Sequence, residues 1–357
     1  MVNIFEELFT VLTDGKKAIL ARIIRQVGSA PRSLGAKCLI LEDGSVVGSI
    51  GGGCLELQVM EAAKNLFREG KTRILNYQMV GKELAQSEML CGGIVDVLLE
   101  PLFPDNSMAN DVFKRASNLV REGKTGTLLT LVADGMDYNR HSRVVMEPDG
   151  VITGDFGDAL TVDASSYEKW SKANKPLMVE VEEGAPAIFS EPIEPDTVLY
   201  LFGAGHISTF VAPLAKMVGF RVCVIDDREE FVNSTRFPNV DELIVCPFHD
   251  AFNRISINAS SYITIITRGH IHDRDVLRDA LQTDCAYIGM IGSLRKRQII
   301  YTSLAEEGVS EETLQQVHSP IGLDIGAETP EEIAVSIAAE LIQARLNRAV
   351  EKPPVEF

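Results

Sequence analysis

Three consecutive glycines followed at once by a cysteine are the feature of this sequence that most directly suggests chemistry. The glycines are Gly51, Gly52 and Gly53. They place bare backbone next to the thiol of Cys54. Residues 55–67 have the apolar spacing of an amphipathic helix, so we expect Cys54 near a helix N-terminus, where free N–H groups and the helix dipole favour a thiolate. The pattern predicts a sulfur that contacts a ligand, and the alternative is a glycine turn beside a buried structural cysteine.

A second cysteine beside bare backbone is Cys91, which precedes two glycines and a predicted strand. We expect Cys91 to flank the same site as Cys54 or, alternatively, to pack in the core. Arg32, in the segment 28–32, is a candidate anion-binding side chain. The remaining cysteines lie in apolar strand contexts and are expected to be core residues: Cys38, Cys223, Cys246 and Cys285.

A second glycine-rich turn follows the apolar strand 198–202. Its sequence is G-x-G-x-x-S, with Gly203 for a tight turn and Gly205 for the close approach of a phosphate to the following helix. Asp226 ends the next predicted strand, where an acid that binds ribose is expected. His206 places an imidazole at the mouth of this predicted pocket, and Ser208 stands where the usual third glycine would be. The alternative is an empty Rossmann fold kept as a scaffold.

Two further loops are expected at the same edge of the sheet, because ligands of open parallel sheets bind outside the carboxyl ends of the strands. One contains Arg268 and His270, and the other contains Ser293. These side chains offer local positive charge and hydrogen-bonding groups. His270 and His272 are also candidate metal ligands, although two histidines alone are a weak indication of a metal site.

The elements that position these loops divide the chain in two. From residue 196, after a proline-bearing stretch at 191–196, buried strands alternate with helices. This order predicts a Rossmann-like, doubly wound parallel sheet over 196–357. The last predicted helix begins at Thr329-Pro330, with Glu332 completing a capping box.

The first half, residues 1–193, is expected to be an α+β domain with an internal duplication over about 1–103 and 109–193. In each copy a helix, a Gly-Lys turn, a strand and a hairpin at Asp-Gly follow one another, so that Gly15 corresponds to Gly123 and Gly44 to Gly150. Only the first copy has the glycine–cysteine loop. We infer that the first copy kept the working loop and that the second became its support.

Composition narrows the function. The chain has 357 residues and a formal net charge of −17, so general binding to nucleic acid or to an anionic membrane is not expected. No apolar run has the length of a membrane span, no signal peptide is evident, and the six cysteines lack C-x-x-C spacing, so we expect a cytoplasmic protein with free thiols. The motifs of serine hydrolases, P-loop NTPases and zincins are absent from the sequence.

Taken together, these motifs resemble the xanthine dehydrogenase accessory factor family (XdhC/CoxI). The resemblance rests on seven stretches in order, namely residues 28–32, 48–56, 91–93, 202–206, 267–270, 289–293 and 320–327. It implies a maturation factor that binds the molybdenum cofactor (molybdopterin), protects it and helps to insert it into xanthine dehydrogenase or a related molybdenum hydroxylase. It also implies that Cys54 contacts the cofactor, with its sulfur as a candidate ligand of the molybdenum.

Three readings of function remain open at this point. The favoured one is a cofactor chaperone without turnover of its own, with a homodimer as the expected assembly and a cysteine desulfurase as a candidate partner. The second is an NAD(P)-dependent oxidoreductase that uses the G-x-G turn, His206 and Asp226. The third is a partner-binding scaffold whose Rossmann pocket is vestigial.

Overall fold

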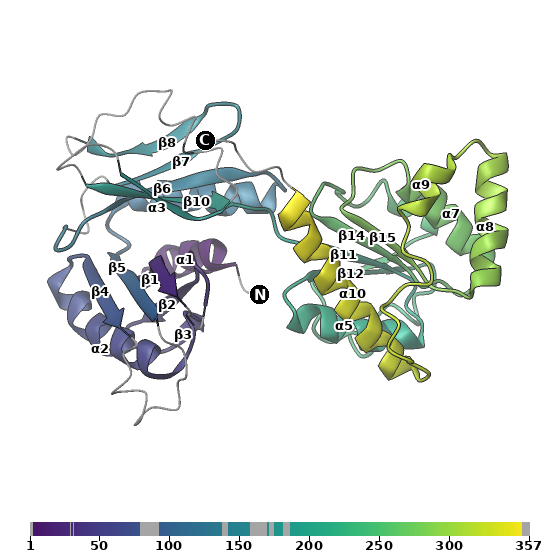
Figure 1. The fold of residues 1–357 in the computed structure, drawn as a ribbon, viewed down its shortest axis with the longest axis horizontal. Helices are drawn as coiled ribbons and strands as arrows, with labels where there is room; N and C mark the ends of the chain where they lie inside the picture. The colour runs from purple at the N-terminus through teal and green to yellow at the C-terminus, as the bar shows by residue number, and fades with distance from the viewer. Residues whose placement is uncertain are drawn as a thin grey trace. The chain divides into compact units, whose positions relative to one another are not determined.

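The chain consists of two compact units, Val2–Pro195 and Asp196–Phe357. The computed structural model describes residues 3–28, 30, 32–78, 93–137, 142–157, 170, 175–180 and 186–351, and it describes backbone alone from 346 onward. Figure 1 shows a mixed α/β fold in both units. No helix in the described ranges combines the length and the apolar character needed to cross a lipid bilayer.

The C-terminal unit contains one five-stranded sheet in the order β13-β12-β11-β14-β15. All four neighbouring pairs are parallel, which confirms the predicted doubly wound, Rossmann-like sheet. The strands are β11 (Val198–Phe202), β12 (Arg221–Asp226), β13 (Glu242–Val245), β14 (Ser261–Ile265) and β15 (Tyr287–Met290). The helices are α5 (His206–Met217), α6 (Phe248–Ala251), α7 (His270–Ala280), α8 (Leu294–Glu306), α9 (Glu311–Gln315) and α10 (Pro330–Glu351).

Helices cover both faces of this parallel sheet. Alternate residues of the buried strand β11 point to opposite faces, so Leu201 belongs to a core with α5 and α10, while Phe202 belongs to a core with α6, α7 and α8. Helix α10 buries Ala334, Ile337 and Leu341, which are spaced by three and four residues and therefore lie on one helical face. Burial on both faces leaves the loops at the strand ends as the accessible part of the sheet.

The N-terminal unit contains two antiparallel sheets with the same strand order, β3-β2-β1-β5-β4 and β8-β7-β6-β10-β9. The elements of the first copy are α1 (Ile4–Thr13), β1 (Ala18–Gly28), β2 (Lys37–Leu41), β3 (Val46–Gly48), α2 (Gly53–Glu69), β4 (Arg73–Gln78) and β5 (Gly93–Leu102). Those of the second copy are α3 (Ser107–Arg121), β6 (Gly126–Val132), β7 (Arg143–Met146), β8 (Ile152–Asp155), β9 (Leu177–Val179) and β10 (Ala187–Ile193). Most of the segment between β8 and β9 lies outside the described residues.

The two copies match in conformation as well as in strand order. The paired hairpin glycines Gly44 and Gly150 have φ values of 84° and 88°, in the left-handed region that glycine adopts readily. The register also matches, because Glu100 lies opposite Leu20 in the first sheet and Glu191 lies opposite Leu128 in the second. The fold therefore agrees with the duplication predicted from the sequence.

A shared core joins the two copies. Helices α1 and α3 pack together and contribute to one cluster that also contains residues of both sheets, such as Leu20 and Leu128. The opposite face of the first sheet packs on α2, through Leu55, Val59 and Ala63. The first sheet is thus buried on both faces, and the direction of β3 sets the end of the sheet from which the glycine–cysteine loop leaves.

Five charged side chains lie in and around this shared core. Arg22 is fully buried and pairs with Glu100 and with Glu191, the latter at 2.9 Å between Nη1 and Oε2. Arg143 pairs with Glu100 at 2.7 Å, and Lys37 pairs with Glu191. Each glutamate therefore receives a cation from the other copy. Burial alone would raise the pKa of Glu100, but the charges of Arg22 and Arg143 outweigh it and keep that pKa below its usual value.

Removing the charge of Glu100 tests how strongly this network holds the copies together. We expect Glu100→Gln to lower the free energy of unfolding of the N-terminal unit by about 3–5 kcal/mol, because Arg22 and Arg143 would lose a buried counter-charge. Urea denaturation followed by the fluorescence of Trp170 measures this, since Trp170 is the only tryptophan of the chain and lies buried in that unit.

The matched control is Glu61→Gln, which removes an exposed carboxylate that pairs with Lys64 at 2.6 Å. We expect a change of at most about 0.5 kcal/mol for this variant. Equal, small effects of both substitutions would contradict a structural role for the buried network.

Candidate functional site

The glycine–cysteine loop leaves the first sheet after β3 and enters α2. Gly51, Gly52 and Gly53 have φ values of 130°, 73° and 63°, a run of left-handed conformations that residues with a Cβ rarely adopt. A Cβ on Gly52 would meet no atom within 4 Å, so the backbone there faces open space. Cys54 is a free cysteine in the first turn of α2 and is partly exposed. The loop thus presents a thiol beside uncovered backbone, as the sequence predicted.

Glu56 occupies amide donors of the same loop. Its Oε1 accepts hydrogen bonds from Ser49 Oγ at 2.7 Å and from the Ile50 N–H at 3.2 Å. Partial burial would raise the pKa of Glu56, but these bonds and those from the Gly51 and Gly52 amides outweigh it and lower the pKa. The carboxylate therefore engages the amides that precede α2, and the thiol of Cys54 follows them in the first turn of the helix.

The register places several predicted residues at one end of the first sheet. In this antiparallel order β1 ends at Gly28, β5 begins opposite it at Gly93, and β3 ends at Gly48 beside the beginning of β2. The loop that carries Arg32, which is exposed, and the loop that precedes Cys54 therefore leave the sheet at the same end. Cys91 lies outside the described residues, and its predicted place beside Cys54 stays a prediction.

The second copy follows the first up to this loop and then departs from it. Ile50 and its counterpart Phe156 are both fully buried, and Gly157 has a φ of 53° where the first copy has Gly51. The residue directly after Gly157 is an aspartate, and the second copy has no cysteine at this loop. The other cysteine near the loop, Cys38, is buried, and burial together with the charge of Glu56 raises the pKa of its thiol to about 12.

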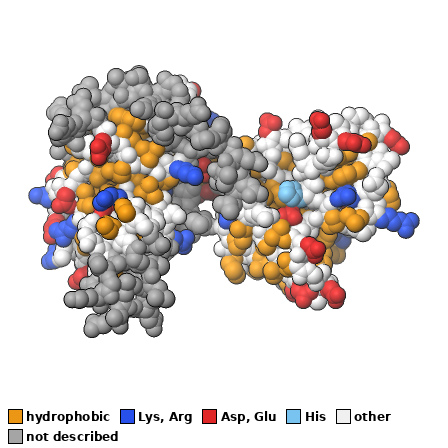
Figure 2. Space-filling model, viewed as in Figure 1, with side chains coloured by type: hydrophobic (Ala, Val, Ile, Leu, Met, Phe, Trp, Pro, Cys, Tyr) orange, Lys and Arg blue, Asp and Glu red, His pale blue; other side chains and the backbone are white. Residues whose placement is uncertain are grey.

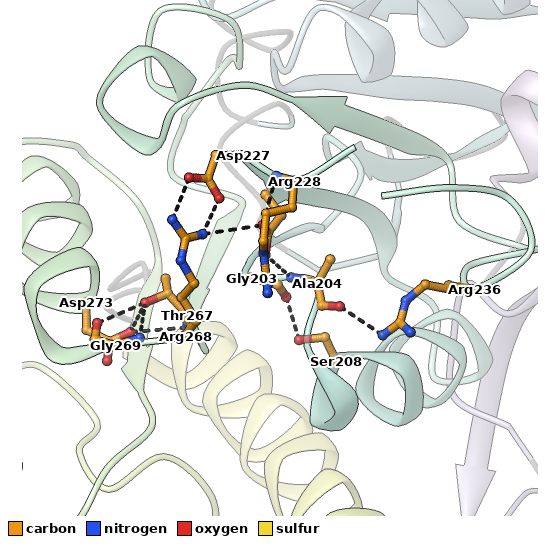
Figure 3. Close-up of polar contacts among 11 residues, drawn as sticks. Gly203, Ala204, Ser208, Asp227, Arg228, Arg236, Thr267, Arg268, Gly269 and Asp273 are labelled. Carbon is orange, nitrogen blue, oxygen red and sulfur yellow. Dashed lines mark hydrogen bonds and ion pairs between the residues drawn. The ribbon is translucent and has the colours of Figure 1, made fainter. Parts of the chain in front are cut away.

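The turn after β11 has the geometry of a tight Rossmann loop. Gly203 has a φ of 106°, and a Cβ there would lie 2.1 Å from the carbonyl oxygen of Ile266, so only glycine fits. A Cβ on Gly205 would meet no atom within 4 Å. Ser208 is buried in α5 and donates a hydrogen bond of 2.6 Å to the Gly203 carbonyl, so the residue in place of the third glycine links the helix to the turn (Figure 3).

Asp226 ends β12 as predicted, and its carboxylate is fully engaged. Oδ2 accepts from the Ala204 N–H at 2.8 Å and from Arg228 Nη2 at 2.9 Å. Oδ1 accepts from the N–H and Nε of Arg228 at 3.1 Å and 2.8 Å. Asp226 is entirely buried and joins the turn after β11 to the loop after β12.

Arg268, predicted as a binding residue, pairs with Asp227 through Nη1 and Nη2 (Figure 3). The hydrogen bonds from Arg268 lower the pKa of Asp227 to about 2. His206 is the exposed first residue of α5, and its ring lies edge-on to Phe210 at 5.2 Å between centroids.

The two other predicted loops are tied together at the same edge of the sheet. His270 is exposed at the beginning of α7, and Ser293 caps α8 by accepting from the Lys296 N–H at 3.2 Å. The buried carboxylate of Asp273 accepts from Thr267 Oγ1 at 2.6 Å and pairs with Lys296. Within the described ranges, no group of three or more His, Cys, Asp or Glu side chains is arranged to hold a metal ion.

Three residues at these sites were missed by the sequence reasoning. The role of Glu56 could have been inferred from the sequence, because an acidic residue in the first turn of a helix can reach back to the preceding amides. That of Arg228 could also have been inferred, because it stands two residues beyond the acid that ends the second strand, where an arginine can read a ribose phosphate. The role of Arg236, whose Nη2 donates to the Ala204 carbonyl at 3.1 Å, could not have been inferred, since only the fold brings residue 236 back to the turn.

A Rossmann domain combined with a duplicated α+β domain that carries a partly exposed cysteine in a glycine-rich loop defines the class of this protein. Two family models match the chain in order, the XdhC and CoxI family over residues 11–78 and the XdhC Rossmann domain over residues 199–341. The chain belongs to the XdhC and CoxI family.

Relatives match almost the whole chain. A protein of Bacillus subtilis (strain 168), named as a probable subunit of xanthine dehydrogenase, is 27% identical over 352 residues, which cover 98% of this chain and 100% of the relative. The "Molybdenum cofactor insertion chaperone PaoD" of Escherichia coli (strain K12) is 22% identical over 337 residues, 94% of this chain and 86% of the relative. The crystal structure of a xanthine dehydrogenase from Bacillus halodurans has a TM-score of 0.80 and 28% identity, covering 99% of this chain and 98% of that one.

The two glycines of the Rossmann turn give a matched pair of variants. We expect Gly203→Ala to lower the free energy of unfolding of the C-terminal unit by roughly 2–4 kcal/mol, because the added Cβ would meet the Ile266 backbone in a left-handed conformation. We expect Gly205→Ala to change it by less than about 1 kcal/mol, since its Cβ would enter open space. Denaturation followed by circular dichroism measures both, and the reverse ranking would contradict this geometry of the turn.

The hydrogen bonds that Glu56 accepts from the loop predict that the stability of the N-terminal unit depends on pH. Because the folded-state pKa is lowered, the stabilising contribution of Glu56 is complete above the ordinary glutamate pKa of 4.5 and is lost as the pH falls through the folded value. We expect the wild-type chain to be more stable than Glu56→Gln at pH 7 and the difference to shrink below pH 4.5, measured by urea denaturation with Trp170 fluorescence. A difference that grows on acidification would contradict these hydrogen bonds of Glu56.

Proposed function

We propose that this protein is an accessory factor that binds the molybdenum cofactor as cargo and assists its insertion into xanthine dehydrogenase or a related molybdenum hydroxylase. The observation that carries the proposal is the partly exposed thiol of Cys54, placed after three left-handed glycines at the beginning of α2. Family membership supports the maturation role, and so does the printed name of PaoD, a relative over most of the chain.

The chemistry of the loop suits a cargo that carries molybdenum and sulfur. Thiolate is a soft ligand and favours soft metal–sulfur centres, whereas carboxylates and amides do not. Glu56 engages the amides that precede α2, so the loop offers a sulfur beside bare backbone. A single thiolate contact beside the glycine–cysteine loop permits reversible binding of the cofactor, which a carrier requires. Protection of the cofactor would then come from covering its metal edge.

The rest of the proposal concerns assembly and surroundings. We infer that the protein works in the cytoplasm as a homodimer, hands its cargo to a molybdenum hydroxylase and has a cysteine desulfurase as a further partner. The surface is compatible with protein partners, since basic side chains are scattered among acidic ones on the described part of the face in Figure 2.

Cysteine substitution tests the carrier role directly. We expect Cys54→Ala to reduce the affinity for isolated molybdenum cofactor at least about tenfold, as loss of one charge-assisted or metal–ligand contact would do. Mass spectrometry and absorbance after incubation with the cofactor measure bound cargo. Cys285→Ala is the matched control, because Cys285 is also a free, partly exposed cysteine but lies in the other unit.

Undiminished binding by Cys54→Ala, or an absence of stoichiometric binding by the wild-type chain, would contradict the carrier role. Turnover of a substrate with NAD(H) or NADP(H) would instead favour the oxidoreductase. Full maturation of the client enzyme by a Gly205→Trp variant would favour a scaffold whose Rossmann turn has no ligand.

A further inference from the structure

The Rossmann turn of the C-terminal unit differs from an ordinary NAD site in the state of its acidic residue. A carboxylate offers about four lone-pair positions to donors. Asp226 receives four hydrogen bonds, one from Ala204 and three from Arg228, and it has no exposed surface. Ribose hydroxyls would have to displace one of these donors, so Asp226 serves to hold the loops together.

Two arginine side chains lie near the turn after β11 and near Asp226. The guanidinium carbon of Arg228 lies 3.8 Å from the centre of the Phe231 ring, and that of Arg236 lies 4.9 Å from it. Arg236 also donates to the Ala204 carbonyl, the residue between the two glycines of the turn. Arg228 and Arg236 both belong to the segment between β12 and β13, and Figure 3 shows both of them near the Gly203–Ala204 backbone. The side chains beside the turn are therefore cationic and held in place by an aromatic ring.

The charges in this cluster do not cancel. Arg228 is paired with Asp226, and Arg268 is paired with Asp227. Across the part of the chain that the structure describes, no carboxylate lies within ion-pair distance of Arg236, and its buried Nε has no hydrogen-bond partner. One uncompensated positive charge with an unused donor thus stands beside the turn, in a protein whose net charge is −17.

We propose that this turn binds a nucleotide that carries a phosphate monoester on its adenosine ribose, with Arg236 as the residue that reads this phosphate. A guanidinium group matches a phosphate in shape and charge, and Rossmann folds that bind NADP place an arginine close to the acid of the second strand to accommodate the ribose 2′-phosphate. Arg228 is taken up by Asp226, whereas Arg236 contacts the same Phe231 ring and has no carboxylate partner among the described residues. The ligand class is that of NADP, and the engaged state of Asp226 disfavours NAD. The proposal is independent of Cys54 and of the molybdenum cofactor.

Calorimetric titration of the full-length protein with four commercial ligands tests this. We expect NADP⁺ to bind at least about tenfold more tightly than NAD⁺, and adenosine 2′,5′-bisphosphate at least about tenfold more tightly than 5′-ADP, as a charged hydrogen bond to one phosphate would give. Arg236→Met should weaken binding of NADP⁺ about tenfold and leave that of NAD⁺ unchanged, while Arg236→Lys should restore part of the difference.

The control is Arg221→Gln, at the opposite end of β12, where Arg221 is exposed and pairs only loosely with Asp196 at 4.0 Å. It should leave all four affinities unchanged. The proposal is overturned if NAD⁺ and NADP⁺ bind equally, if NAD⁺ binds more tightly, if none of the four ligands binds, or if Arg236→Met keeps the preference for the phosphate. Cys54→Ala should not alter nucleotide affinity, so a failure here is distinct from a failure of the carrier role.

Discussion

The packing of the N-terminal unit depends on buried ion pairs that join its two copies. Glu100 and Glu191 hold equivalent positions, and each is neutralised by the first residue of the second strand in the opposite copy, Arg143 or Lys37. Arg22 bridges both glutamates. Because taking such charges out of water is expensive unless every partner is in place, the two sheets can pack in this way only when their registers match. That packing holds in place the sheet from which the Cys54 loop leaves after β3.

In our proposal, the first copy of the duplication carries the chemistry and the second copy supports it. The copies share strand order, hairpin glycines and a buried apolar residue at the beginning of the loop, Ile50 in one and Phe156 in the other. Beyond that residue, the first copy continues with glycines and a thiol. The second copy supplies cations and apolar surface to the first, through Arg143 and Leu128, so it contributes to the site as support for its framework.

In both units a carboxylate engages backbone donors of a glycine-rich loop. Glu56 accepts from amides of the glycine–cysteine loop, and Asp226 accepts from the amide of Ala204. In our proposals, a neighbouring side chain then recognises the ligand in each unit. That side chain is Cys54 in the first unit and Arg236 in the second.

The sequence by itself determined the parallel sheet of the C-terminal unit, the duplicated topology, the glycine turns and the position of Cys54, because these follow from local periodicity and from backbone conformations that only glycine adopts. It also placed Asp226 correctly at the end of β12. The tertiary structure alone decided what Asp226 binds, which cations reach Glu100 and Glu191, and that Arg236 returns to the turn after β11. These contacts join residues that are distant in the chain, and their partners depend on packing and desolvation, which leave no periodic pattern in the sequence.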